Sequence, residues 1–171
     1  MAQTAMKKQA SSLAADTDAP AARSWSEEED VSLRLWIALA RCYLTFSREV
    51  SVRVGEYGLT LPQFGVLEAL HHLGPLALGE LAEKLLVTGG NVTFVMDRLE
   101  EQGLVYRDRS DEDRRVVMAK LTPDGRRLIE GSFPKHAVFL RGLMDELTPN
   151  EQQHLRRLLK KLGKSVGDPD E

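Results

Sequence analysis

Apolar residues repeat with the 3.6-residue period of an α-helix in six stretches of this chain, separated by short polar or glycine-containing segments. Several stretches begin with a helix-capping signal. Ser26 with Glu29, and Thr148 with Glu151, form capping boxes, in which each residue's side chain accepts a hydrogen bond from the other's backbone N–H. The expected helices cover residues 26–57, 60–72, 79–85, 89–102, a segment that opens at Pro123, and 148–162.

The period changes to two after Gly103, a glycine placed to end the helix before it. Residues 104–106 and 116–121 are expected strands, and the polar tract 107–115 is expected to be the long charged loop of a β-hairpin. A short helix, a turn, a second helix and a hairpin, in that order, form a winged helix-turn-helix. The sequence therefore predicts a mainly α (α+β) fold class with this unit at 58–122.

The first expected helix carries apolar residues on more than one face, among them Val31, Leu35, Ile37 and Leu44. A helix that is apolar nearly all round needs cover on most sides. One small domain seldom supplies that cover, so we expect a partner subunit.

Charge is unevenly distributed. The 171 residues have a formal net charge of −3, and the first 30 residues account for all of it, so a nucleic-acid binder of this kind needs local basic charge. A single cysteine, Cys42, excludes a disulfide framework and a cysteine-rich zinc module. No apolar run reaches the ~18 residues of a membrane span and no secretory signal is visible, so the expected location is the cytoplasm.

An ordered set of motifs resembles the MarR family of bacterial transcription regulators, over about residues 30–165. The motifs are Leu61-Pro-Gln-Phe-Gly-Val-Leu, Gly79-Glu-Leu-Ala, Val92-Thr-Phe-Val-Met-Asp-Arg-Leu-Glu-Glu-Gln-Gly-Leu-Val, Asp113-Arg-Arg-Val-Val and Leu121-Thr-Pro-Asp-Gly-Arg. The resemblance implies a homodimeric regulator, expected to be a repressor, that reads a palindromic operator in double-stranded DNA. It also implies that a small molecule or an oxidant bound between the dimerisation and DNA-binding parts weakens DNA binding.

These observations together predict the domain organisation. Residues 25–165 form a single MarR-like domain, in which 26–57 and 123–165 are dimerisation helices. Residues 1–24 lack apolar periodicity and are expected to be a disordered extension, and 166–171 a frayed tail.

The helix at 89–102 is the expected recognition helix. Its N-terminal half carries small and polar residues, which permit a close approach to DNA, and its free N–H groups favour phosphate. Asp97 and Glu101 repel phosphate, so the C-terminal half is expected to point away from DNA or to pair with arginines. The predicted DNA-binding residues of this helix are Thr88, Gly90, Asn91, Thr93, Phe94 and Arg98.

The charged hairpin loop is the expected wing. Arg109 and Arg114 are predicted phosphate contacts. By the resemblance, Arg115 inserts into the minor groove, where a narrow groove attracts a guanidinium, and Asp113 orients it. The alternative for the whole tract is a solvated charged turn, and the acidic residues do not match a calcium loop.

The sequence leaves the signal open. A small aromatic or phenolic anion is the broad expectation from the resemblance, with Trp36, Tyr43, Phe46, Phe64 and His72 as candidate lining residues. Cys42 is expected to be a small buried hydrophobe, with a redox switch as the alternative.

Rival functions are a winged-helix dimer that binds proteins without reading DNA, and a metal-responsive regulator. The second would need His71 or His72 to act with His136 or His154, because adjacent histidines on a helix point about 100° apart. No metal site and no cofactor is predicted. No enzyme motif is present, so the chain is not expected to be an enzyme.

Overall fold

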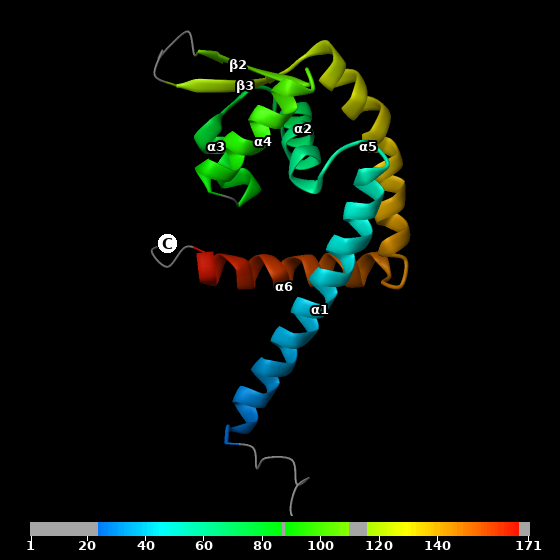
Figure 1. Ribbon diagram of the computed structural model, residues 1–171. Helices are drawn as coiled ribbons and strands as arrows, with labels where there is room; N and C mark the ends of the chain where they lie inside the picture. The colour runs from blue at the N-terminus through cyan, green and yellow to red at the C-terminus, as the bar shows by residue number, and fades with distance from the viewer. Residues whose placement is uncertain (1–23, 87, 110–115, 168–171) are drawn as a thin grey trace, which may run out of the picture. The chain divides into compact units, whose positions relative to one another are not determined.

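The computed structural model describes residues 24–86, 88–109 and 116–167, and the chain divides inside its first helix into two units, 1–42 and 43–171. The expectations for the N-terminal extension up to residue 23, for the wing loop at 110–115 and for residues 168–171 lie outside the described residues. In chain order the elements are α1 (Glu27–Gly55), α2 (Leu61–Leu73), β1 (Leu76–Ala77), α3 (Leu78–Leu85), α4 (Gly89–Glu101), β2 (Val105–Arg109), β3 (Val117–Leu121), α5 (Pro123–Leu143) and α6 (Pro149–Gly167) (Figure 1).

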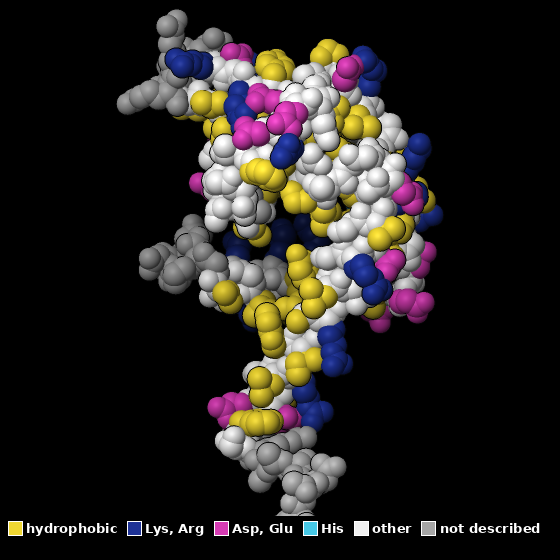
Figure 2. Space-filling model, in the orientation of Figure 1, with side chains coloured by type: hydrophobic (Ala, Val, Ile, Leu, Met, Phe, Trp, Pro, Cys, Tyr) yellow, Lys and Arg dark blue, Asp and Glu magenta, His cyan; other side chains and the backbone are white. Residues whose placement is uncertain are grey.

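The first unit consists, in its described part, of the N-terminal half of α1 and three residues before it. The predicted capping box starts this helix: the backbone N–H of Ser26 donates to Glu29, and that of Glu29 donates to Ser26 Oγ, 3.2 Å away. Its large apolar side chains from Val31 to Ile37 are exposed, and Figure 2 shows hydrophobic side chains along this half of the helix. Nothing in the described unit buries them.

The second unit contains the hydrophobic core. An antiparallel sheet of order β1-β3-β2 packs with α2, α3, α4 and α5, and the predicted mainly α fold is confirmed. Its register pairs Val105 with Leu121 and Leu76 with Ala119. The largest fully buried side chains are Phe64, Leu67, Leu81, Met96, Leu99, Ile129, Val54, Val66 and Val92.

Local signals set the helix boundaries here as well. Thr60 and Gln63 form the expected capping box at α2, and Thr88 caps α4. Gly103 follows α4 with a φ of 69°, a left-handed conformation that costs a residue with a Cβ more than it costs glycine. Helix α4 therefore ends where the glycine lets the chain turn into β2.

The Leu-Thr-x-x-Gly motif closes the base of the hairpin. Thr122 donates from its backbone N–H to Leu104 O at 3.1 Å and from its hydroxyl to Gly103 O at 2.7 Å. Its hydroxyl oxygen also accepts the N–H of Gly125 at 3.0 Å, which caps α5. A Cβ on Gly125 would collide with the carbonyl oxygen of Leu104. The motif thus fixes where the hairpin leaves α4 and where α5 begins.

Four features differ from the sequence expectations. The two-residue strand β1 was not predicted, because its ladder partners lie some 40 residues away in β3. Strand β2 extends through Arg109, so the first residues of the polar tract belong to the sheet and not to the loop. Helix α6 continues to Gly167, beyond the expected end at 162. Cys42 is exposed, not buried, because it lies in a stretch of α1, residues 41–45, that no described part of the chain covers.

Candidate nucleic-acid interface

The N-terminal half of α4 is open and uncharged. Thr88, Gly90, Asn91, Thr93 and Phe94 are all exposed, while the opposite face of the helix is buried in the core. The backbone N–H of Asn91 donates to Thr88 Oγ1 at 3.4 Å, and a Cβ added at Gly90 would meet no described neighbour within 4 Å. Another molecule can therefore approach the backbone of this first turn closely.

Phe94 and Arg98 share the exposed side of the helix. The Phe94 side chain is 61% exposed, and the Arg98 guanidinium carbon lies 5.4 Å from its ring centroid. Arg98 also pairs with Glu101 at 2.8 Å. The ring is therefore accessible, and its predicted contact with a thymine methyl group stays a prediction.

The acidic residues of α4 are paired with arginines, as expected. Arg107 of β2 forms an ion pair with Asp97 at 2.8 Å and a second one with Glu100. Together with the Arg98–Glu101 pair, these contacts reduce the negative charge that the helix would present to a polyanion. The sequence did not single out Arg107, because an arginine in a charged tract has no spacing that distinguishes a structural role from a DNA contact.

The two strands of the hairpin are joined by an exposed ion pair as well as by their ladder. Asp108 Oδ2 accepts a hydrogen bond from Lys120 Nζ at 2.8 Å, and this bond holds the pKa of the Asp108 carboxyl below its ordinary value. Arg109 is exposed at the end of β2. The predicted wing residues Asp113, Arg114 and Arg115 lie outside the described residues.

The predicted effector residues differ in their exposure. Trp36 and Tyr43 are exposed on α1, Phe46 is half-buried, and Phe64 lies in the core. His72 is exposed, with its ring 4.6 Å from that of Phe133.

Phe64 belongs to a group of aromatic and basic side chains that meets where α1, α2 and α5 pack. The ring of Phe64 lies 6.0 Å from Tyr57 and 4.6 Å from His136, and the Arg53 guanidinium carbon lies 5.9 Å from Tyr57 and 5.5 Å from Phe139. We call these five residues the aromatic cluster. Phe64 is the one member that the sequence proposed as an effector residue; the other four come from separate parts of the chain with no common spacing.

Polar atoms inside the aromatic cluster lack partners. Arg53 Nε, Tyr57 OH and His136 Nδ1 are buried and make no hydrogen bond within the described residues. Burial lowers the pKa of the His136 imidazole, which the nearby Arg53 also lowers and Glu68 raises. Unpaired buried polar atoms are rare, and each is expected to meet water, a ligand or a rearranged neighbour.

Known proteins resemble this chain in sequence. The model of the MarR family matches residues 59–117, which run from just before α2 to the start of β3. The HTH-type transcriptional regulator MhqR of Bacillus subtilis (strain 168) is 34% identical over 132 residues, covering 77% of this chain and 91% of MhqR. This chain belongs to the MarR family.

Two similar solved structures concern DNA binding directly. A mutant MarR from E. coli, complexed with operator DNA, is 27% identical with a TM-score of 0.71, covering 80% of this chain and 99% of that one. BpsR of Bordetella bronchiseptica, whose DNA binding is regulated by 6-hydroxynicotinic acid, is 28% identical with a TM-score of 0.65, covering 76% and 98%. This member of the MarR family is accordingly a DNA-binding transcription regulator with a winged helix-turn-helix.

Two other kinds of feature are absent from the described residues. Among residues 24–86, 88–109 and 116–167, no three His, Cys, Asp or Glu side chains are placed to hold a metal ion. No helix in the described part of this MarR-family chain is long and apolar enough to cross a membrane.

Proposed function

We propose that the chain acts as a homodimeric repressor that reads a palindromic operator with α4 and the hairpin, and that a hydroxylated aromatic acid releases it. The observation that carries the proposal is the division of α4: its exposed N-terminal half is uncharged and accessible, and the acidic residues of its C-terminal half are paired. A recognition helix contacts base edges with its N-terminal residues, so this division suits insertion into the major groove.

The DNA contacts are assigned by chemistry. Thr88, Asn91 and Thr93 would bond to base edges or phosphates, Gly90 would admit a phosphate to the helix N-terminus, and Phe94 would contact a thymine methyl. Arg98 and Arg109, with Arg114 and Arg115 of the wing, would contact phosphates or the minor groove, with Asp113 orienting Arg115.

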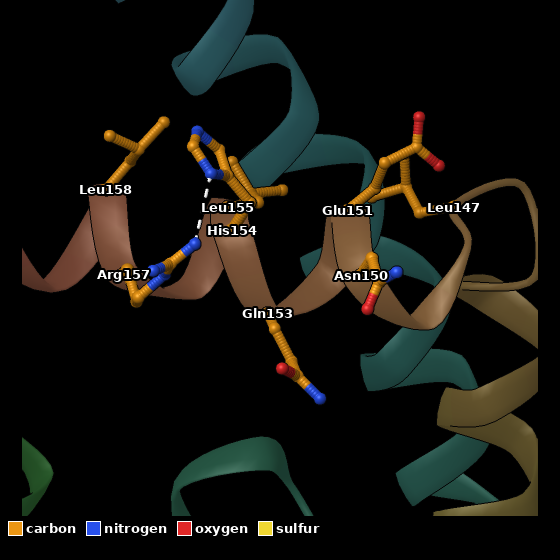
Figure 3. A pocket seen from close by; sticks show the side chains of 8 residues that line it. All are labelled: Leu147, Asn150, Glu151, Gln153, His154, Leu155, Arg157 and Leu158. Carbon is orange, nitrogen blue, oxygen red and sulfur yellow. Dashed lines mark hydrogen bonds between the residues drawn. The ribbon is translucent and has the colours of Figure 1, made fainter.

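Dimerisation is supported by apolar faces that the described chain leaves uncovered. Helix α6 has one stripe of large apolar residues, and its cations stand on the opposite face. Figure 3 shows part of α6, where an open hollow is lined by Leu147, Leu155 and Leu158 together with polar residues, and Arg157 bonds to His154 at 3.3 Å. A second copy would cover α6 and the apolar side chains of α1. Two recognition helices would then reach successive major grooves about 34 Å apart.

The aromatic cluster is our proposed effector site. A hydroxylated aromatic acid would stack on its rings, place its carboxylate at Arg53 and offer its hydroxyl to Tyr57 or His136. Phe64 and His136 are buried here, 1% and 4% exposed, so a ligand could stack on their rings only if α1, α2 and α5 moved apart. A ligand that binds such a conformation better shifts the population toward it and away from the DNA-binding conformation. The residues predicted from sequence, such as Tyr43, provide the comparison for this assignment.

A DNA-binding titration tests the proposal. Fluorescence anisotropy would compare a duplex selected by the protein from a random library with an unselected duplex, with and without 6-hydroxynicotinic acid as probe. We expect the selected duplex to bind at least ~10³-fold tighter. The probe should release DNA from the wild type and from Tyr43→Phe, but not from Tyr57→Phe.

Equal binding of both duplexes would overturn the repressor function. Release that depends on Tyr43 and not on Tyr57 would move the effector site to the residues predicted from sequence. Absence of release by the probe from any variant would overturn this ligand class while leaving DNA reading intact.

A further inference from the structure

One arginine of the hairpin is bound to the recognition helix through both its side chain and its main chain. The Arg107 side chain is 23% exposed, and its guanidinium pairs with Asp97 and Glu100. Its Nη2 also donates to the backbone carbonyl oxygen of Thr93 at 3.1 Å. The backbone N–H of Arg107 donates to Glu100 Oε1 at 2.7 Å, so Glu100 binds both the side chain and the main chain of this residue.

The three acceptors lie in a row along α4. Residues 93, 97 and 100 are spaced i, i+4 and i+7, which places them on one face of the helix over two turns. A planar guanidinium with donors in a fixed fork can bind several acceptors in such a row at once, which an ammonium group cannot do in the same geometry. The side chain of Arg107 therefore joins β2 to α4 along that length.

This connection bears on how the hairpin is oriented. Arg107 pairs with Ala119 of β3 in the sheet, so a residue fixed to α4 is also fixed within the hairpin. The base of the hairpin is held independently by Thr122, at the end of β3. Two separate attachments to the α4 segment define a direction, whereas the base alone would leave the hairpin free to pivot.

We propose that Arg107 is a positioning residue that clamps the hairpin to the recognition helix and does not itself contact DNA. This inference rests on DNA reading by α4 and the hairpin. Its consequence is that the two DNA-reading elements approach the duplex as one rigid body, and specific binding depends on Asp97 and Glu100 although both carry the same sign of charge as DNA.

The clamp and simple electrostatics predict opposite results for one substitution. Glu100→Gln removes a negative charge from a DNA-binding helix, which by charge alone tightens binding to any duplex. If Glu100 serves the clamp, the same change weakens binding to the selected duplex. Glu101→Gln is the matched control, because it removes the same charge from the same helix, where Glu101 pairs only with Arg98 among the contacts described.

The experiment measures anisotropy on the selected and unselected duplexes across a salt series. We expect Glu100→Gln and Arg107→Lys each to weaken binding to the selected duplex by about tenfold, the effect of about one charge-assisted hydrogen bond. Binding to the unselected duplex should be unchanged or tighter. Arg107→Gln should lower the affinity for the selected duplex without changing the slope of log K against log salt, since no phosphate contact is lost.

Several results would overturn the clamp. If Glu100→Gln bound both duplexes more tightly, as Glu101→Gln is expected to do, the result would show that only charge matters. A slope reduced by about one in Arg107→Gln would make Arg107 a phosphate contact. If Arg107→Lys bound the selected duplex as tightly as the wild type, the forked donors of the guanidinium would not be needed.

Thermal melting followed by circular dichroism separates these outcomes from unfolding. The clamp predicts that the double variant Glu100→Gln/Arg107→Gln loses no more specific affinity than Arg107→Gln alone, while both remain folded at the assay temperature. Losses that simply add would contradict a shared role. If the wild type failed to prefer the selected duplex, the DNA-reading function would fail first, and that result is distinct from each of the others.

Discussion

The winged unit and the C-terminal helix use the same sequence pattern with opposite results. Helix α4 has apolar residues at helical spacing, and Val92, Met96 and Leu99 are at most 1% exposed. Helix α6 has the same kind of stripe, yet Leu155, Leu158, Leu159 and Leu162 are each at least 42% exposed. The first stripe is covered by the sheet and by α2 and α3, while no described part of the chain covers the second to a similar degree.

The difference shows what an amphipathic pattern does and does not specify. The pattern indicates that a helix face is to be removed from water, because apolar burial is the main favourable term in folding and association. It does not indicate whether the cover comes from the same chain or another. The N-terminal half of α1 belongs with α6 in this respect, since its side chains from Val31 to Ile37 include five large hydrophobic residues that are exposed.

The largest predicted effect comes from substituting exposed leucines of α6. Leu158→Glu with Leu162→Glu should leave the single chain folded, because both side chains are already about half exposed, but should abolish dimerisation. Each leucine buried in an interface contributes roughly 1.5–3 kcal/mol, so the dissociation constant should rise by orders of magnitude. Sedimentation over a concentration series measures it.

Two variants complete that test. Lys160→Glu with Lys161→Glu changes charge on the opposite face of α6 and should leave the dimer largely intact. Leu99→Ala in the core should instead cost about 2–5 kcal/mol of unfolding free energy at every protein concentration. If the leucine double variant sedimented like the wild type, α6 would not be a dimer interface.

A smaller effect concerns the glycine at the tip of the recognition helix. Gly90→Ala should raise the unfolding free energy by about 0.5–1 kcal/mol, because alanine favours helix and no described atom obstructs its Cβ. The same methyl group should weaken DNA binding by about tenfold if the helix N-terminus lies against a phosphate, as for a lost hydrogen bond.

Gly90→Ala should thus raise stability and lower DNA affinity, and two measurements test these opposite changes. Chemical denaturation gives stability, and anisotropy on the selected duplex gives affinity. Gly131→Ala, an equally unobstructed helical glycine in α5, should show the gain in stability without the loss of affinity. Unchanged or tighter DNA binding by Gly90→Ala would place the first turn of α4 away from the phosphates.

Features determined by neighbouring residues could be predicted from the sequence. The starts of α1 and α2, the cap at Thr88 and the turn at Gly103 each depend on residues within four positions, and all are as expected. Strand β1 and the extension of β2 depend on pairing with β3. Their sequences alone carry neither a clear period nor enough length to predict a strand.

The residues of the candidate site also fall into those that the sequence predicts and those that only the packing reveals. The exposed residues of α4 follow from its helical period and from the resemblance to the MarR family. The role of Arg107 and the aromatic cluster around His136 depend on which helices and strands meet, and Arg53 and His136 are 83 positions apart. A basic residue in a charged tract, or a lone histidine, has many possible partners, and only the packing of α1, α2, α4, α5 and β2 selects among them.

The smallest predicted effect is a pH dependence of stability that comes from the buried side chain of His136. Burial lowers the pKa of His136 below its ordinary value of 6.5, so the unfolded chain binds a proton more readily than the folded chain. Stability contributed by the neutral ring is therefore complete above pH 6.5 and is lost as the pH falls toward the lowered pKa. Glu29, Glu151 and Asp108, whose pKa values are also lowered, lose their contributions only below their ordinary values of 4.5, 4.5 and 3.8. The melting temperature of the wild type should thus fall between pH 7.5 and 5.5, and that of His136→Phe should fall less. As a control, His154→Phe on exposed α6 should behave as the wild type. Equal dependence of the melting temperature on pH in all three proteins would show that the buried ring does not control acid stability.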